Sequence, residues 1–234
     1  EKDSTFMTVQ FYAAAAASLA KDSRLAIAAL ERAKNTPYRQ YDVYQYLCYE
    51  YGEARTAQDS VMLEKTFEEG MQVFPDSAFF LNNLINTYIY SNRNEKALEM
   101  LNVAIQKNPN DANLYNVMGR VYETGLKDYA NAEKNFQIAL EKDPNLTDAL
   151  SNIGRIYYNQ GVNKLSEANM INDSKKYQEE LSMAKDLFKK ALPYYKKAHE
   201  AEPEKMDNMI ALRGIYYNLN MGPELEAIEA EMNK

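Results

Sequence analysis

The chain has 234 residues, of which 46% are hydrophobic and 26% are charged, and its formal net charge is −7. This composition is typical of a folded protein rather than a disordered one. The negative charge opposes non-specific binding to nucleic acid or to anionic membranes, so we expect no nucleic-acid partner. Cys48 is the only cysteine, which rules out an intrachain disulfide and leaves the compartment open.

The first segment, 4–37, predicts two helices separated by Asp22, which is expected to cap the second helix. Its most apolar stretch, Phe6 to Ala20, is interrupted by Gln10 and is shorter than the roughly 20 residues that span a bilayer. We therefore expect no direct membrane insertion. The alanines from 13 to 17 favour helix but offer little area to bury, which predicts a further packing partner at this end, either residues before Glu1 or another subunit.

Segments 38–75 and 76–109 each begin with a helix in which apolar positions follow one spacing. That spacing is i, i+3, i+4 and i+7, the pattern of an amphipathic helix. The residues at these positions are Tyr44, Leu47, Cys48 and Tyr51 in the first segment and Leu81, Leu84, Ile85 and Tyr88 in the second. Segment 38–75 is about three residues longer than segment 76–109, and we expect the extra residues in a loop near Arg55 to Ser60.

Segment 110–144 shows the pattern most fully. Large and small apolar residues alternate in two helices on either side of a break at Gly125, where one extra residue is expected. Small residues let two helix backbones approach closely while aromatic rings fill the spaces beside them. The positions concerned are Tyr115, Met118, Gly119, Tyr122, Ala132, Phe136 and Ala139.

Segment 145–203 follows the same pattern but holds an insertion at 162–186, and segment 204–234 closes the chain. Apolar residues continue through the insertion at steps of three and four, which predicts that both helices extend and turn back near Asn172, Asp173 and Ser174. The extended pair is expected to project as a finger. The last helix departs from the pattern at Glu229 and is predicted to be a polar cap.

This recurring hairpin resembles the tetratricopeptide repeat (TPR). The resemblance implies an all-α, right-handed superhelical α-solenoid of about six TPR-like helical hairpins, forming a single domain over 1–234, with the extended insertion in the fifth hairpin. It also implies a scaffold that binds a protein or peptide whose identity the sequence does not name. The Asn and Tyr content and the finger are similar to those of bacterial, Bacteroides-type envelope TPR proteins, which favours the periplasm or cell envelope, with the cytoplasm as the alternative.

Candidate chemistry is sparse. Cys48 occupies the small position between helices and is interpreted as a packing residue, while His199 is the only histidine and is interpreted as exposed. The acidic pairs Glu68-Glu69 and Glu179-Glu180 are adjacent along helices and point in different directions, which is poor geometry for acid and base catalysis. We therefore expect no enzyme activity, no cofactor and no metal.

In the TPR family the first helices of the repeats line the concave face of the superhelix, and polar residues here recur in columns on that face. Asparagine can pair with a peptide backbone and arginine can fork onto a carboxylate, which predicts an extended peptide or an acidic tail as ligand. The predicted binding residues are Asn82, Asn116 and Ser151 in one column, Asn86, Arg120 and Arg155 in the next, and Tyr90 and Tyr158 beside them. The columns lack the paired lysines of the family's clamp for chaperone tails.

Three alternatives stay open at this level. The columns can be ordinary solvated side chains of a solenoid's exposed face. The finger can carry the partner instead, through apolar residues near its tip such as Met170 and Met183. A structural role is the third alternative, in which the alanine-rich first helix and the finger pack on other copies of the chain and form a homo-oligomer.

Overall fold

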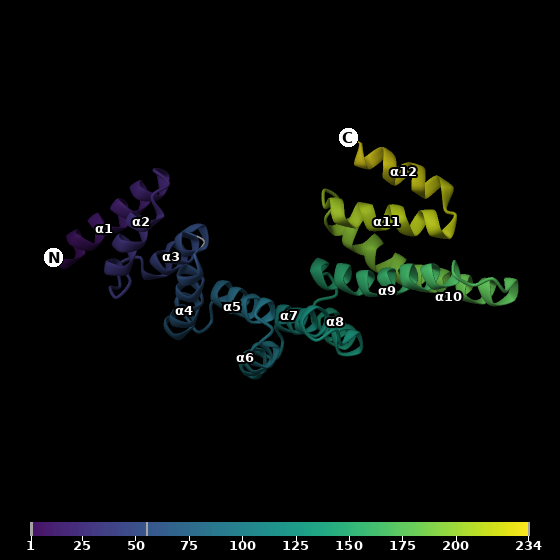
Figure 1. Ribbon diagram of the computed structural model, residues 1–234, viewed down its shortest axis with the longest axis horizontal. Helices are drawn as coiled ribbons and strands as arrows, with labels where there is room; N and C mark the ends of the chain where they lie inside the picture. Colours follow the sequence, from purple (N-terminus) through teal and green to yellow (C-terminus); the bar gives the residue numbers. More distant parts are fainter. Residues whose placement is uncertain (1, 55, 234) are drawn as a thin grey trace. The chain divides into compact units, whose positions relative to one another are not determined.

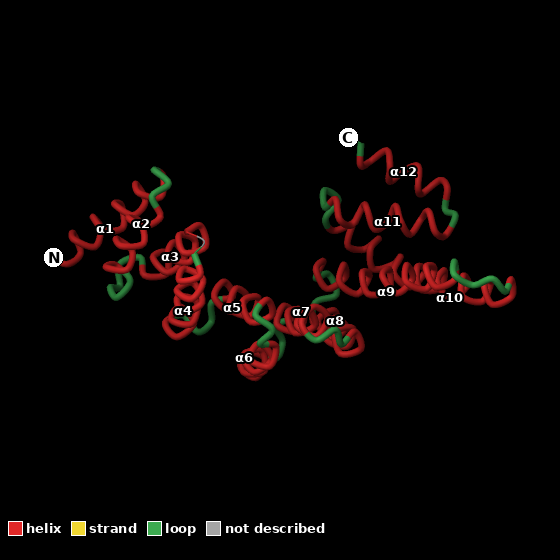
Figure 2. The backbone as a smooth tube through the Cα atoms, viewed as in Figure 1, coloured by secondary structure: helices red, strands yellow, loops and turns green. Residues whose placement is uncertain are grey.

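The computed structural model describes residues 2–54 and 56–233, including the side chains of 5, 6, 8–53 and 56–233. Arg55, at the start of the predicted extra loop, lies outside the described residues. In the described part all regular structure is helical (Figure 2). The elements are α1 (Lys2–Leu19), α2 (Ser23–Ala33), α3 (Gln40–Ala54), α4 (Ala57–Val73), α5 (Ala78–Tyr90), α6 (Asn94–Lys107), α7 (Ala112–Arg120), the π-helical turn η1 (Val121–Gly125), α8 (Tyr129–Lys142), α9 (Thr147–Ala168), α10 (Ser174–Ala201), α11 (Met206–Leu219) and α12 (Gly222–Met232).

The chain divides into two compact units, 1–97 and 98–234, so that the boundary falls within α6. Each unit is built from helices that pack on their neighbours in the sequence. The organisation of the whole chain as a single domain, and the bounds and number of its repeats, stay predictions.

In unit 1, α1 packs on α2, α2 on α3, α3 on α4 and α4 on α5. The predicted cap of α2 is confirmed, because the Asp22 side chain accepts a hydrogen bond from the backbone N–H of Leu25 at 3.1 Å. The core between the first three helices is apolar and includes Phe11, Leu30 and Leu47. Within this unit Ala14 and Ala17 of α1 are buried, whereas Phe6, Val9, Tyr12 and Leu19 on the same helix are exposed.

The predicted loop near Arg55 to Ser60 is wrong, because α4 already begins at Ala57. Thr56 and Asp59 form a capping box, in which each side chain accepts a hydrogen bond from the backbone of the other. Such a box satisfies two of the free N–H groups at the start of a helix. The extra residues of this segment therefore lengthen α3 and α4 instead of forming a loop.

In unit 2, α7 and η1 pack on α8, α8 on α9, α9 on α10, α10 on α11 and α11 on α12. Two apolar clusters fill the spaces between these helices. One surrounds Phe136 and Ile153, and the other surrounds Phe188 and Leu212. All four side chains are almost fully buried.

Glycines and aromatic rings interlock between paired helices, as the alternation of small and large residues predicts. A Cβ atom added to Gly119 on α7 would lie 2.5 Å from the Phe136 ring on α8, and one added to Gly154 on α9 would lie 2.8 Å from the Tyr195 ring on α10. In unit 1, Gly70 meets Phe80 at 2.6 Å in the same way. The absence of a side chain at each glycine is what lets the facing ring lie against the helix backbone.

The extra residue expected near Gly125 is accommodated by η1. A π-helical turn holds one more residue than the α-helical turn it replaces, and it is often found at functional sites. Here η1 continues α7 and ends at Gly125, and it places Glu123 among buried residues. A change in local helix geometry has thus brought a carboxylate to a position that is nearly sealed from solvent.

The helical insertion at 162–186 is confirmed as an extension of α9 and α10, which lie side by side in Figure 1. The predicted cap is also present, since Asp173 accepts a hydrogen bond from the backbone N–H of Lys176. This finger packs against α11 and α12 through Leu165, and Met170, in the turn between α9 and α10, is exposed. None of the helices in the described residues has the length and apolar character that crossing a membrane requires.

Candidate functional site

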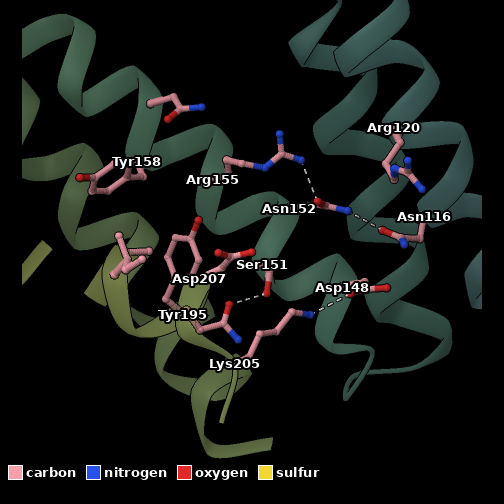
Figure 3. Close-up of a pocket in the computed structure, with 14 residues that line it drawn as sticks. Asn116, Arg120, Asp148, Ser151, Asn152, Arg155, Tyr158, Tyr195, Lys205 and Asp207 are labelled. Carbon is pink, nitrogen blue, oxygen red and sulfur yellow. Dashed lines mark hydrogen bonds and ion pairs between the residues drawn. The ribbon is translucent and has the colours of Figure 1, made fainter. Parts of the chain in front are cut away.

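Five of the eight predicted binding residues line one hollow in unit 2, with a volume of about 480 Å³ (Figure 3). We call this hollow the polar recess. Its walls come from α7, α9, α10 and α11, and polar side chains predominate among them. The predicted residues that line it are Asn116, Arg120, Ser151, Arg155 and Tyr158.

Amide and hydroxyl groups in the polar recess are paired across helices. Asn152 on α9 donates from Nδ2 to Oδ1 of Asn116 on α7 at 2.9 Å, and Ser151 donates from Oγ to Oδ1 of Asn208 on α11 at 2.9 Å (Figure 3). Asn116 is 5% exposed and Asn208 is 1% exposed. Buried amides are normally held by such hydrogen bonds, so these pairs fix the orientation of the polar groups in the recess.

Neither Asn152 nor Asn208 is among the binding residues predicted from the sequence. Each occupies a position where the preceding hairpin carries an apolar residue, Val117 and Ala149 respectively. A polar side chain at a core position of the repeat was therefore the signal that could have found them. In the described part of the chain the Nδ2 atom of Asn208 has no hydrogen-bond partner.

Arg155 is held by a buried carboxylate, that of Glu123, which is not among the residues predicted from the sequence either. Its guanidinium group lies 2.8 and 2.9 Å from the two carboxylate oxygens of Glu123, and it donates to Oδ1 of Asn152 at 2.8 Å. The Glu123 side chain is 6% exposed, whereas that of Arg155 is 43% exposed. Both terminal nitrogens of Arg155 therefore already bind a carboxylate of its own chain.

The electrostatics of this pair follow from the difference in burial. Burial raises the pKa of the Glu123 carboxyl above its ordinary value, because an ionised carboxylate loses its hydration there, and the nearby charges of Arg155, Lys127 and Arg120 offset part of the rise. Two hydrogen bonds from a guanidinium group are the arrangement that best compensates a buried carboxylate. We therefore describe Glu123 and Arg155 as an ion pair.

A second cation that lines the polar recess is also paired. Lys205, at the start of α11, lies 3.1 Å from Asp148 and 3.0 Å from Glu202. Tyr158 reaches across to α11, where its hydroxyl occupies the space that a Cβ atom at Gly214 would need. Tyr158 thus fits against the backbone of the last hairpin instead of standing alone beside the columns.

The other three predicted residues lie on α5, in unit 1. Asn82 and Tyr90 are exposed, and Tyr90 is the most exposed of the set at 88%, while Asn86 is half-buried. Their part in a binding surface stays a prediction.

Cys48 and His199, the two side chains weighed as catalytic or metal-binding residues, are both removed from open solvent. Cys48 is buried at 5% exposure, and burial raises the pKa of its thiol to about 12, so it is protonated at neutral pH. The interpretation of His199 as exposed is wrong, because it is half-buried and its Nε2 atom lies 3.3 Å from Glu231 on α12. The last hairpin places α12 beside the His199 end of α10, a long-range contact that the sequence around His199 does not predict.

The fold defined by these hairpins is that of the tetratricopeptide-repeat proteins, an all-α helical-repeat solenoid. A comparison with protein-family models gives no match, and neither does a comparison with curated protein sequences. Solved structures with the same fold include a TPR protein from Parabacteroides merdae, at 14% identity and a TM-score of 0.56, over 96% of this chain and 77% of that one.

Two further structures are similar. PilW, described as a widely conserved type IV pilus biogenesis factor, has 16% identity and a TM-score of 0.57, over 97% of this chain and 91% of that one. MamA has 18% identity and a TM-score of 0.52, over 86% of this chain and 94% of that one. At these identities the likeness shows the fold alone.

Proposed function

We propose that this chain is a non-catalytic scaffold that binds another protein by holding an extended peptide segment in the polar recess. The observation that carries the proposal is the convergence of four column residues and Tyr158, from two successive hairpins, on one hollow that is also lined by Asn152, whose amide is paired with that of Asn116. An amide group can donate to and accept from a peptide backbone at once. Extended peptides are commonly recognised through their main-chain groups in this way.

The charges of the polar recess favour an uncharged segment over an acidic tail. Arg155 is compensated by Glu123, and Lys205 is compensated by Asp148 and Glu202. A ligand carboxylate would have to displace one of these partners, and displacing Glu123 would leave a buried charge without compensation, which is costly. Backbone carbonyl and N–H groups can instead hydrogen-bond to the amides without disturbing either ion pair.

The test uses a substitution on the wall of the recess that leaves its ion pairs intact. Ile210 lines the recess and is 46% exposed, so Ile210→Asp places a charge in the opening without disturbing the core. Val103→Asp, at a side chain 55% exposed on α6, is the matched control. Peptides selected from a random library with the wild-type chain are then titrated into each variant by calorimetry.

We expect the selected peptides to bind Ile210→Asp at least about tenfold more weakly than the wild type, a difference of about 1.4 kcal/mol. Binding to Val103→Asp should be unchanged. Equal affinity for all three proteins would refute the recess as the binding site. Selection of strongly acidic peptides would contradict the preference for an uncharged segment.

Homo-oligomerisation is the second candidate, and the exposed apolar residues of α1 favour it. Phe6, Val9 and Tyr12 are each at least half exposed, and Leu19 is 87% exposed. Apolar side chains gathered on one helix often mark an interface. Analytical ultracentrifugation tests the idea: Val9→Lys should convert a concentration-dependent dimer to a monomer, and a wild-type chain that is monomeric at all concentrations would rule it out.

A further inference from the structure

A second hollow lies wholly within unit 1 and differs in chemistry from the polar recess. Its volume is about 700 Å³, and it is bounded by α1, α3, α4 and α5. Aromatic rings and neutral amides are its main components. We call it the aromatic groove and define it by Gln45, Tyr46, Tyr49, Phe67, Phe79 and Asn83.

The rings of the aromatic groove are open to a ligand to different degrees. Tyr46 and Tyr49 stand on one face of α3, three residues apart, and are 45% and 58% exposed. Phe79 on α5 is half-buried and packs edge-on against Phe67, with ring centroids 6.3 Å apart. Two exposed aromatic side chains beside a hollow offer apolar area that a ligand can bury.

The surroundings hold these rings in place. Tyr46 packs edge-on against the buried ring of Phe11, at 5.7 Å between centroids, and the hydroxyls of Tyr41 and Ser77 lie 3.1 Å apart, which joins α3 to α5. Tyr49 is thus presented by a helix that is fixed on both sides. A preorganised aromatic surface loses little conformational entropy when a ligand binds.

The charged groups at the edge of the groove do not favour a charged ligand. The Arg39 guanidinium group lies 2.6 Å from the Asp42 carboxylate and stacks over the Phe11 ring at 4.5 Å. What remains for a ligand is a set of ring faces, tyrosine hydroxyls and the side-chain amides of Gln45 and Asn83. The amide of Asn83 already donates to the Phe79 carbonyl at 2.8 Å, which leaves its oxygen as an acceptor.

We propose that the aromatic groove is a binding site for an uncharged, proline-rich segment of a partner protein in the polyproline II conformation. This conformation has no internal hydrogen bonds, so its carbonyl groups are free to accept from tyrosine hydroxyls and from the Gln45 amide. Proline rings present flat apolar faces that pack on aromatic side chains, and the stiff segment has little entropy to lose.

A polyproline II helix has three residues per turn, so one face of the segment presents equivalent rings at regular intervals. Those rings can pack on Tyr49 of α3 and Phe79 of α5, which both line the groove. An amphipathic helix would instead set its apolar face against the amides and the Arg39–Asp42 pair.

The experiment measures fluorescence anisotropy of three labelled peptides of equal length: a ten-residue oligoproline, a ten-residue Gly-Ser repeat and an amphipathic helical peptide. We expect saturable binding of the oligoproline and at least tenfold weaker binding of the other two. Tyr49→Ala should weaken oligoproline binding at least tenfold. Tyr129→Ala, at a tyrosine 50% exposed on α8, is the matched control and should have no effect.

Tyr49→Phe keeps the ring and removes the hydroxyl, so it should lose less affinity for oligoproline than Tyr49→Ala does. It provides a second readout if the alanine variant changes the helicity measured by circular dichroism. The proposal is overturned if oligoproline does not bind, if it binds Tyr49→Ala as tightly as the wild type, or if the Gly-Ser or helical peptide binds as well. The aromatic groove is lined by residues of unit 1 and the polar recess by residues of unit 2, so Ile210→Asp should leave oligoproline binding unchanged.

Discussion

The interlocking of glycine and aromatic residues predicts a large cost for adding one methyl group to α7. In Gly119→Ala the new Cβ would lie 2.5 and 2.6 Å from two carbons of the Phe136 ring, whereas ordinary van der Waals contact begins near 3.4 Å. Phe136 is fully buried and cannot swing into solvent. Overpacking of this kind costs about 1–3 kcal/mol, and the close approach to a rigid ring places this site near the upper end.

Helix propensity acts in the opposite direction, because alanine is favoured over glycine in a helix by about 1 kcal/mol. The net expectation for Gly119→Ala is therefore a loss of about 2 kcal/mol in the free energy of unfolding. Gly52→Ala on α3 is the matched control, because among the described residues no packing neighbour lies within 4 Å of its added Cβ. That variant should gain up to about 1 kcal/mol from propensity alone.

Urea unfolding followed by circular dichroism measures both changes. A Phe136→Leu background should reduce the cost of Gly119→Ala, since the smaller side chain vacates the space that the methyl group needs, and a double-mutant cycle isolates this coupling. If Gly119→Ala stabilises the protein as much as Gly52→Ala does, the interlocking of α7 with α8 is refuted.

Three further predictions concern single side chains. Arg155→Met should lower the free energy of unfolding by about 2–3 kcal/mol, because it leaves the buried Glu123 carboxylate without its donor. Glu123→Gln should lower it less, because Arg155 is partly exposed. Equal losses in urea unfolding would contradict this. Hydrogen bonds from Arg24 and Thr56 lower the pKa of Asp59 from 3.8 to about 2. The stability that the ionised carboxylate provides is therefore present above pH ~4 and is lost as the pH falls toward 2. In urea titrations, Asp59→Asn should lose less stability between pH ~5 and pH ~2.5 than the wild type does. The Cys48 thiol should react with iodoacetamide only after unfolding, and rapid labelling of the native protein would show that it is not sealed.

The spacing of large and small residues by itself determined the helical hairpins of this protein. The i, i+3, i+4, i+7 pattern depends only on the pitch of the α-helix, so it can be read locally, and Gly119, Gly154 and Phe136 occupy the interhelical positions that this pattern implies. The caps at Asp22 and Asp173 were equally readable, because a cap involves residues two or three apart. The exception was the start of α4, where the Thr56–Asp59 box begins a helix inside the expected loop.

The tertiary structure alone decided what the polar columns can do. Glu123 and Arg155 are 32 residues apart, Asn116 and Asn152 are 36 apart, and Ser151 and Asn208 are 57 apart. Whether such side chains meet depends on how far each helix is rotated toward its neighbour, and the extra residue in η1 changes that rotation for Glu123. Arg155, which the sequence offers to a ligand carboxylate, is already paired with Glu123. The tyrosines of α3 border a groove that only the packing of four helices creates. Local periodicity specifies which face of a helix is apolar, but the depth of a hollow and the partner of a charge arise from angles between helices that no single stretch of sequence contains.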